Sequence, residues 1–453
     1  MPTPLFENRT LYAPAHFGNT HEVMGVREMR SVISEAKFWG YTHYGDWFDT
    51  IDCSDPFADP GHHNLGHAMW MRKKQNYRSA CELGLKCAMT ITPNHVFLDQ
   101  CEPDLLATKG DRIFGQLICP SIPRAREIIL GNYENWFDDL AKAGVALSAL
   151  CPLPYDYGGC SCEDCSPYII TFAELMRDIH AIAEGHHPGV EMHPIGWWWG
   201  EEEHRLHAEW SDRETPGLVK SISLHIPYGE TSVGDVLLPR GCERRAFVHI
   251  GYADKAQPRD VYGHLGAVIA WERIEQTVRT LKAQNCTGVM AYDEGSFDDV
   301  NRAILAGLGS GQHATADDVI RAYVERYFGP ETVEAWVSWL KAWGTPFEAD
   351  AAALLAEYES LSAGREPSWR LRQWGLKAEL LAIHVEIGDG DEWPDERLAA
   401  VERFQAAEER LQREVWGLGT MRHIFARQFN PLPWYGSWAK HEAEEAVTRR
   451  DGE

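Results

Sequence analysis

The strongest constraint on the fold is a regular alternation of short apolar runs with helical segments over the first two thirds of the chain. The apolar runs that have the length and composition of buried strands are 11–17, 41–47, 86–92, 146–153, 190–198, 219–226, 246–251 and 286–292. The segments between them carry apolar residues at helical spacing. Eight strands that alternate with helices predict a (β/α)8 TIM barrel over residues 1–310. A further apolar run, 113–118, is an inserted strand or part of a loop.

The pattern changes after residue 310. Amphipathic segments punctuated by Gly, Pro and Ser follow one another, and no segment rich in β-branched residues interrupts them. This pattern predicts an α-helical C-terminal domain over residues 311–453, packed against the barrel.

Charge and hydropathy restrict the partners. The 453 residues carry a formal net charge of −25, so we expect neither nucleic acid nor an anionic membrane as the main partner. No apolar run reaches the roughly 18 residues that a membrane-spanning helix needs. The N-terminal segment lacks the pattern of a secretion signal, so we expect a cytoplasmic protein. The sequence leaves homo-oligomerisation open.

Polar and aromatic residues follow the predicted strands. Catalytic groups of an α/β barrel lie where strands end and the following loops begin, so these residues are predicted to meet at one end of the barrel. We expect hydrogen bonds to substrate hydroxyl groups from most of them and stacking on a sugar ring from the tryptophans. Loops are polar in any case, and Asp293 could instead pair with an arginine. The predicted substrate-binding residues are His16, Asp46, Trp47, His95, Trp198, His225, His249, Tyr292 and Asp293.

Carboxylates at three strand ends suit acid–base chemistry. Hydrolysis of a glycoside needs two carboxyl groups on opposite sides of the scissile bond. Asp156 and Glu294 are the predicted central pair, and Glu201 or Glu202 is the competing partner. We expect Gly295 to permit close approach of the substrate. Asp156 could alternatively cap the next helix.

Three cysteines lie close together in the segment DYGGCSCEDCSP. The spacing of Cys160, Cys162 and Cys165 suits a tetrahedral metal such as Zn²⁺ in a structural site. Cys119 is the predicted fourth ligand, with a histidine as the alternative. Three reduced cysteines in a tight turn would give the same spacing without a metal. No phosphate-binding glycine motif is present, so we expect no nucleotide cofactor.

Two segments resemble a known family. YDYGGCSCEDCSP and GVMAYDEGSFDDVNR resemble the segments at the fourth and eighth strands of certain bacterial TIM-barrel glycoside hydrolase-like proteins, distant relatives of β-hexosaminidases and α-glucuronidases. The resemblance covers roughly residues 10–345 in layout and implies sugar-directed chemistry at the barrel end, with a helical domain after the barrel. Hexosaminidases carry a consecutive Asp-Glu pair after strand four, whereas Tyr157 follows Asp156 here, so no substrate is carried over.

These observations favour a glycoside hydrolase of carbohydrate metabolism that acts exo on a small glycoside or oligosaccharide. The first alternative is a metal-dependent sugar isomerase, epimerase or lyase on the same barrel, which a chelator would inactivate. The second is a non-catalytic carbohydrate-binding barrel, which would bind sugar without turnover.

Overall fold

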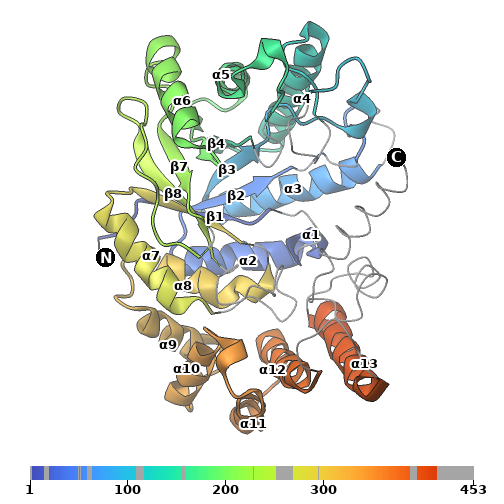
Figure 1. Cartoon of the computed structure of the whole chain (residues 1–453), viewed down its shortest axis with the longest axis vertical. Helices are drawn as coiled ribbons and strands as arrows, with labels where there is room; N and C mark the ends of the chain where they lie inside the picture. The colour runs from blue at the N-terminus through green and yellow to red at the C-terminus, as the bar shows by residue number, and fades with distance from the viewer. Residues whose placement is uncertain are drawn as a thin grey trace.

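The structure is a computed structural model that describes residues 3–14, 20–48, 50, 53–58, 64–108, 117–154, 159–227, 229–250, 269–293, 295–387 and 395–415. Strands lie at the centre of its upper part and helices surround them, while the last helices form a layer below (Figure 1). The arrangement confirms the predicted α/β class, with further helices after the barrel-like part.

One parallel sheet contains all the strands of the described residues, in the order β5-β4-β3-β2-β1-β9-β8-β7-β6. The strands are β1 (Asn8–Tyr12), β2 (His43–Trp47), β3 (Lys86–Ile91), β4 (Leu147–Pro152), β5 (Glu191–Met192), β6 (Ile195–Gly196), β7 (Ser221–His225), β8 (Glu243–His249) and β9 (Gly288–Tyr292). Strands β2, β3 and β9 are buried almost throughout, as expected for a parallel sheet covered on both faces.

The two ends of this strand order are neighbours along the chain. Only His193 and Pro194 separate β5 from β6. The His193 amide donates to the Leu150 carbonyl on one side, and the Pro194 carbonyl accepts from the Ser223 amide on the other, at 2.8 and 2.9 Å. The sheet therefore curls round on itself, and Pro194 interrupts the ladder because it has no N–H to donate. If β5 and β6 are counted as one interrupted strand, each of the eight predicted runs supplies one strand.

The first strand lies earlier in the chain than predicted. Its observed span is Asn8–Tyr12 rather than 11–17. Pro14 lies within the predicted span and cannot donate to a ladder, which favours an end before it. Part of the extra run is described: Leu117 and Ile118 make isolated antiparallel bridges with His95 and Leu106.

Helices alternate with the strands and cover the sheet (Figure 1). They are α1 (Thr20–Val23), α2 (Val26–Trp39), α3 (Leu65–Glu82), α4 (Pro123–Lys142), α5 (Tyr168–His186), α6 (Glu201–Glu214), α7 (Trp271–Ala283) and α8 (Asp299–Gly309). Their buried residues recur at helical spacing, as with Met29, Ile33 and Ala36 of α2.

The remaining helices are α9 (Ala316–Tyr327), α10 (Val333–Ala342), α11 (Ala351–Ser362), α12 (Trp369–Ile387) and α13 (Asp395–Arg410), followed by a π turn (Leu411–Val415). Of these helices, α9 packs on α7, α8 and α2, and those after it pack on one another in chain order. Their buried apolar side chains join those of the barrel in one continuous core. The aromatic richness of this region is core packing, because Trp336, Trp339, Trp343 and Trp374 are all buried and contact one another in sequence. A domain boundary at residue 311 stays a prediction.

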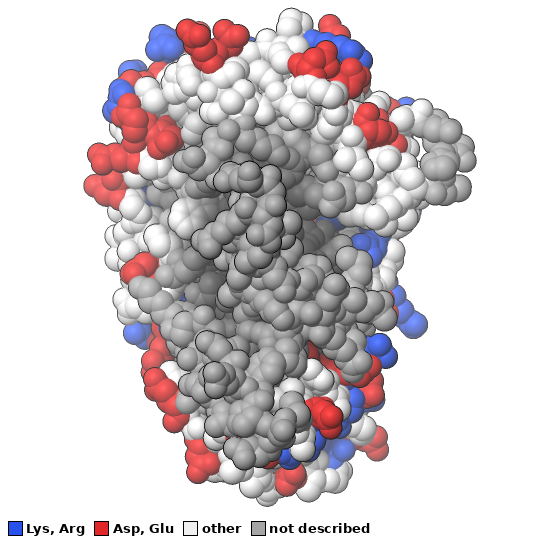
Figure 2. Space-filling view, turned by 45° about the vertical axis from the view of Figure 1, so that its right-hand side comes forward, with Lys and Arg blue, Asp and Glu red and all other residues white. Residues whose placement is uncertain are grey.

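The surface agrees with the acidic composition. On the face in Figure 2, acidic side chains line much of the margin, and Lys and Arg side chains stand in small separate groups. Among the described residues, no helix combines the length and apolar character that crossing a bilayer requires.

Candidate functional site

Aromatic and histidine rings gather at the carboxyl ends of the strands. His225, His249 and Tyr292 end β7, β8 and β9, and Trp197 directly follows β6. The ring of Trp197 lies 4.6 Å from that of His225 and 5.3 Å from that of His249. His249 lies 5.5 Å from His225 and 5.3 Å from Tyr292. We call these four side chains the ring cluster. The structure thus brings together three of the predicted substrate-binding residues.

The two histidines of the ring cluster are neutral at ordinary pH. Burial lowers the pKa of His225 to about 4 and holds the pKa of His249 well below its usual value. A neutral imidazole offers one donor and one acceptor nitrogen. The cluster therefore presents uncharged hydrogen-bonding groups among apolar ring faces.

Trp198 stands at the open side of this cluster. Its side chain is 48% exposed, and its ring lies 5.0 Å from that of His225 and 5.8 Å from that of Trp197. Its backbone has φ 56°, in the left-handed region that a bulky side chain rarely adopts. Strained backbone of this kind concentrates at functional sites. Trp47, the other predicted stacking residue, is instead buried beside His95, at 6.2 Å between rings.

Both carboxylate oxygens of Asp46 are bound by groups of the protein itself. Its Oδ1 atom lies 2.5 Å from the ammonium of Lys73 and accepts the Trp47 amide at 2.8 Å. Its Oδ2 atom accepts the Tyr44 hydroxyl at 2.8 Å. Both charged side chains are 1% exposed. The prediction that Asp46 binds a substrate hydroxyl is not supported by these contacts, because both oxygens already face protein donors.

Asp293 is also bound by the protein, as its alternative interpretation anticipated. Oδ1 accepts from His21 Nε2 at 2.7 Å, from the Gly295 amide at 2.9 Å and from Arg302 Nη2 at 3.1 Å. Arg302 Nε donates to Oδ2. Burial alone would raise the pKa of Asp293, but the charge of Arg302 and the hydrogen bond from His21 lower it to about 2. A fully buried carboxylate with four donors supports the structure around it rather than a ligand.

The absence of a side chain at Gly295 makes room for Thr20. We had expected it to let a substrate approach closely. A Cβ atom at this position would lie 2.0 Å from the Thr20 hydroxyl. That hydroxyl accepts the Ser296 amide at 2.8 Å. The backbone of Gly295 has φ 155°, which an L-residue rarely adopts. The glycine is therefore required by packing against Thr20 of α1.

The two acids after β6 lie on the outside. Glu201 and Glu202 occupy the exposed first turn of α6. Both oxygens of Glu202 accept from Arg205, at 2.6 and 2.9 Å. The hydrogen bond from Arg205 lowers the pKa of Glu202. A lowered pKa is opposite to what a general acid needs.

Three of the predicted residues, Asp156, Glu294 and His16, lie outside the described residues. The strands before the two acids are described: β4 ends at Pro152 and β9 ends at Tyr292. In the strand order, β3, β2 and β1 stand between β4 and β9. The other way round the closed sheet passes β5/β6, β7 and β8. The two acids therefore follow strands on opposite sides of the sheet.

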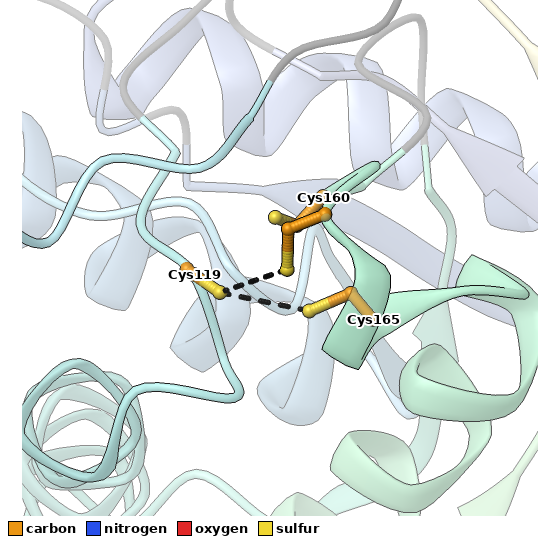
Figure 3. A group of neighbouring side chains, drawn as sticks. Cys119, Cys160 and Cys165 are labelled. Atoms are coloured by element: carbon orange, nitrogen blue, oxygen red, sulfur yellow. Dashed lines mark hydrogen bonds between the residues drawn. The ribbon is translucent and has the colours of Figure 1, made fainter.

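The four predicted metal ligands come together in the loops after β3 and β4. The Sγ atoms of Cys119, Cys160, Cys162 and Cys165 all lie within 4.8 Å of one another. Cys119 lies opposite Cys160 and Cys165 in Figure 3. Its Sγ atom is 3.7 Å from that of Cys162 and 3.6 Å from that of Cys165. We call this group the cysteine cluster.

The geometry of the cysteine cluster fits a zinc ion. Zn–S bonds of about 2.3 Å in a tetrahedron place the sulfur atoms about 3.8 Å apart. Cys160, Cys165 and Cys119 are buried, and Cys162 is half-buried. Polar donors also face the sulfurs: the Thr108 amide donates to Cys160, and the Ser121 hydroxyl lies 2.9 Å from Cys165. Four cysteines so arranged can bind a metal such as zinc.

Arg302 is the main residue that the sequence reasoning missed. It ends the segment GVMAYDEGSFDDVNR, in which the acids Asp293 and Glu294 are predicted site residues. The sequence did contain a signal for the contact between Arg302 and Asp293. An arginine nine residues after a buried aspartate can contact it when about two helical turns lie between them. His21 gave no comparable signal, since 272 residues separate it from Asp293.

Comparison with known proteins adds structural likenesses only. No family model and no curated protein matches the chain. An α-amylase from Geobacillus thermoleovorans, solved with acarbose, is 9% identical and has a TM-score of 0.41, over 69% of this chain and 80% of that one. A GH5_18 protein from Streptomyces cattleya, solved with GlcNAc, is 12% identical with a TM-score of 0.40, over 79% and 91%.

The GH20 catalytic modules of the pneumococcal exo-β-D-N-acetylglucosaminidase StrH are 12% identical with a TM-score of 0.43, over 80% of this chain and 99% of that one. These similar structures are glycoside hydrolases. TM-scores near 0.4 do not define an activity, which must be argued from the side chains.

Proposed function

We propose that this protein is a glycoside hydrolase that acts exo on a small glycoside or oligosaccharide, with Asp156 and Glu294 as its catalytic carboxyl groups. The observation that carries the proposal is the ring cluster together with Trp198. An exposed tryptophan in strained backbone stands beside two neutral histidines, of which His249 is buried and His225 half-buried, at the carboxyl edge of the sheet.

The chemistry of this edge suits a sugar. A pyranose has apolar C–H faces, which stack on an indole ring, and hydroxyl groups, which exchange hydrogen bonds with a neutral imidazole. His225 and His249 remain neutral at ordinary pH, so they bind hydroxyl groups without attracting an anion. Trp198 supplies the ring face.

Elimination supports the choice of acids. Of the acids predicted at the strand ends, Asp46 is paired with Lys73, Asp293 with Arg302, and Glu202 with Arg205. Glu201 is exposed in the first turn of α6, which leaves Asp156 and Glu294 as the pair that we propose. One would protonate the leaving oxygen and the other would act as base.

The positions of the preceding strands favour inversion. Carboxyl groups about 6.5–9.5 Å apart leave room for a water molecule and invert the anomeric centre, whereas about 5–5.5 Å gives retention. Acids that follow β4 and β9 must reach towards each other across the mouth of the sheet. We therefore propose an inverting course.

The test is a screen of chromogenic glycosides, followed by NMR of the first product. Hydrolysis with an inverted product anomer supports both proposals. A trapped covalent glycosyl-enzyme would contradict inversion alone. Sugar binding without turnover would identify a carbohydrate-binding barrel instead, and chelator-sensitive conversion without hydrolysis would identify the metal-dependent isomerase, epimerase or lyase.

Trp198→Ala tests the stacking role separately. Removing the ring should raise KM more than it lowers kcat, because the ring binds the substrate away from the reacting bond. Phe38→Ala is the matched control, since Phe38 is also aromatic and about as exposed, at 49%, but lies on α2. An unchanged KM for Trp198→Ala would show that Trp198 does not bind the substrate, and the proposed function would lose its main support.

We also propose that the cysteine cluster holds one structural Zn²⁺. Four thiolates close a tetrahedral site and leave no position for substrate, which is typical of structural rather than catalytic zinc. Elemental analysis of protein purified without added metal should find about one zinc per chain. Protein that is free of metal and has an unchanged melting temperature would contradict this assignment.

A further inference from the structure

A chain of buried charges leads from the carboxyl end of β9 into the C-terminal helices. Asp293 is bound by Arg302 of α8, as described above. Arg302 Nη1 lies 3.6 Å from Asp299 Oδ1, one turn earlier on the same helix. Asp299 in turn accepts from Arg370 of α12, at 2.6 Å from Nε to Oδ2 and 3.2 Å from Nη2 to Oδ1. We call these four residues the ion chain.

The ion chain is neutral as a whole. Its charges alternate in sign, and its side chains are between 0% and 12% exposed. Charges this deeply buried are tolerated only when each has a partner. Each member therefore depends on its neighbours in the chain.

One end of the ion chain holds the backbone on both sides of position 294. The Asp293 carboxylate accepts the Gly295 amide, and Arg302 Nη2 donates to the Gly295 carbonyl at 3.0 Å. The residue before position 294 and the residue after it thus share one guanidinium.

The other end is fixed by aromatic rings. The Arg370 guanidinium lies 3.7 Å from the centre of the Tyr327 ring and 4.4 Å from that of Trp369. The Tyr323 hydroxyl donates to Asp299 Oδ2 at 2.5 Å. These contacts surround the Arg370 guanidinium, whose two nitrogens orient both oxygens of Asp299.

We propose that Arg370 is a positioning residue for Asp293 and Gly295, the residues on either side of position 294: through Asp299 and Arg302, the C-terminal helices hold these two residues in place. Its catalytic consequence rests on the proposed function, in which Glu294 is a catalytic carboxyl group. The mechanical coupling itself does not depend on any activity.

Hydrogen exchange tests the coupling without a substrate. In Arg370→Met, the amides of Gly295 and Ser296 should exchange about tenfold faster than in the unaltered protein, because Asp293, the acceptor of the Gly295 amide, loses its fixed position and Ser296 follows directly on the same backbone. Arg372→Met is the matched control, since Arg372 is exposed on the same helix. Unchanged exchange at 295 and 296 in a folded Arg370→Met protein would overturn the proposal.

Two further variants keep the test decisive if Arg370→Met does not fold. Arg370→Lys retains the charge but loses the two-pronged contact, so exchange at 295 and 296 should be intermediate. The double variant Asp299→Asn with Arg370→Met removes one charge of each sign and keeps the chain neutral. Faster exchange at these amides in either folded variant supports the proposal, and unprotected wild-type amides would overturn it.

Kinetics test the catalytic consequence. Misplacement of a catalytic group by about 1 Å can cost on the order of 10²-fold in rate, so Arg370→Met should lower kcat by about that factor and leave KM nearly unchanged. Arg372→Met should keep the original kcat. Failure of the unaltered protein to hydrolyse any glycoside would contradict the proposed function, and the exchange experiment would then decide on the coupling alone. Normal kcat in a variant with fast exchange would overturn the catalytic part.

Discussion

The cysteine cluster and the ion chain are both attached to loops that follow strands of the sheet, and they are built on opposite principles. Cys160 comes four residues after Asp156, and Asp293 directly precedes Glu294. The cluster consists of four like groups, which repel one another as thiolates and need a cation from outside. The ion chain alternates charges of its own and needs no added ion.

This difference determines how each can be lost. A bound metal stabilises only while it is available, so the cysteine cluster should respond reversibly to metal concentration. Acidification from neutral pH to about pH 3 leaves the Asp293 end of the ion chain charged, because the pKa of Asp293 is held at about 2. Mutation of a member is therefore the direct way to break the chain.

The largest expected effect concerns Asp156 and Glu294, the acids next to the cysteine cluster and the ion chain. Glu294→Gln and Asp156→Asn should each lower kcat by on the order of 10²–10⁴, because each removes acid–base capacity while keeping the shape. Steady-state kinetics on the best substrate of the screen measures this. Glu209→Gln, on the exposed face of α6, is the control. Near-normal kcat in either variant would show that the acid is not catalytic. The cysteine cluster or ion chain beside that acid would then have no role in catalysis.

Breaking the ion chain should cost more stability than breaking any surface ion pair. Arg302→Met leaves Asp293 and Asp299 buried without their shared partner, which should lower the free energy of unfolding by about 3–5 kcal/mol. Arg279→Met removes an exposed ion pair with Glu275 and should cost less than about 1 kcal/mol. Urea denaturation compares the two. A similar small loss for both variants would show that the ion chain contributes little.

The cysteine cluster could be predicted from sequence because its signal is local. Three of its members lie within six residues, and tetrahedral metals are known to use such spacing. Cys119 was identified by its polar surroundings in QLICPS, and the structure places it beside the other three. Strands such as β3, β4 and β9 were predictable for a similar reason, since each is a short segment rich in apolar residues.

The link from the ion chain to the C-terminal helices could not be predicted, because Arg370 is far from the other members in sequence. Arg370 lies 71 residues after Asp299, on a helix whose pattern indicates only amphipathicity. The same limit explains Asp46. A carboxylate at a strand end has the same sequence pattern whether it faces a ligand or a buried lysine, and the partner Lys73 is set by the packing of α3 on β2.

Metal removal should weaken the protein less than the loss of Arg302, and reversibly. If free Zn²⁺ stands at about 100 times its dissociation constant, its removal costs about 2.7 kcal/mol. Thermal unfolding with and without a chelator measures this, and added zinc should restore the original melting temperature. Cys162→Ser should abolish the response to zinc, whereas Cys242→Ser, outside the cluster, should keep it. A chelator response that persists in Cys162→Ser would place the metal elsewhere.

The smallest expected effect is a dependence of stability on pH that neither the cysteine cluster nor the ion chain causes. Burial lowers the pKa of His207 to about 3 and that of His204 to about 4. In the unfolded chain, a histidine takes up its proton near pH 6.5. Between these values the unfolded state binds more protons, so the free energy of unfolding falls as the pH decreases from 6.5 towards 4.

Each such histidine contributes about 1.4 kcal/mol per pH unit within that window. His207→Gln should therefore reduce the slope of unfolding free energy against pH by the equivalent of one proton, measured by urea denaturation between pH 6.5 and 5. In the unaltered protein the ion chain adds nothing to this slope, because the pKa of Asp293 is held at about 2 and its carboxylate stays ionised across this range. Arg279→Met is the control and should leave the slope unchanged, because it removes only a surface ion pair. An unchanged slope in His207→Gln would show that His207 does not cause the pH dependence.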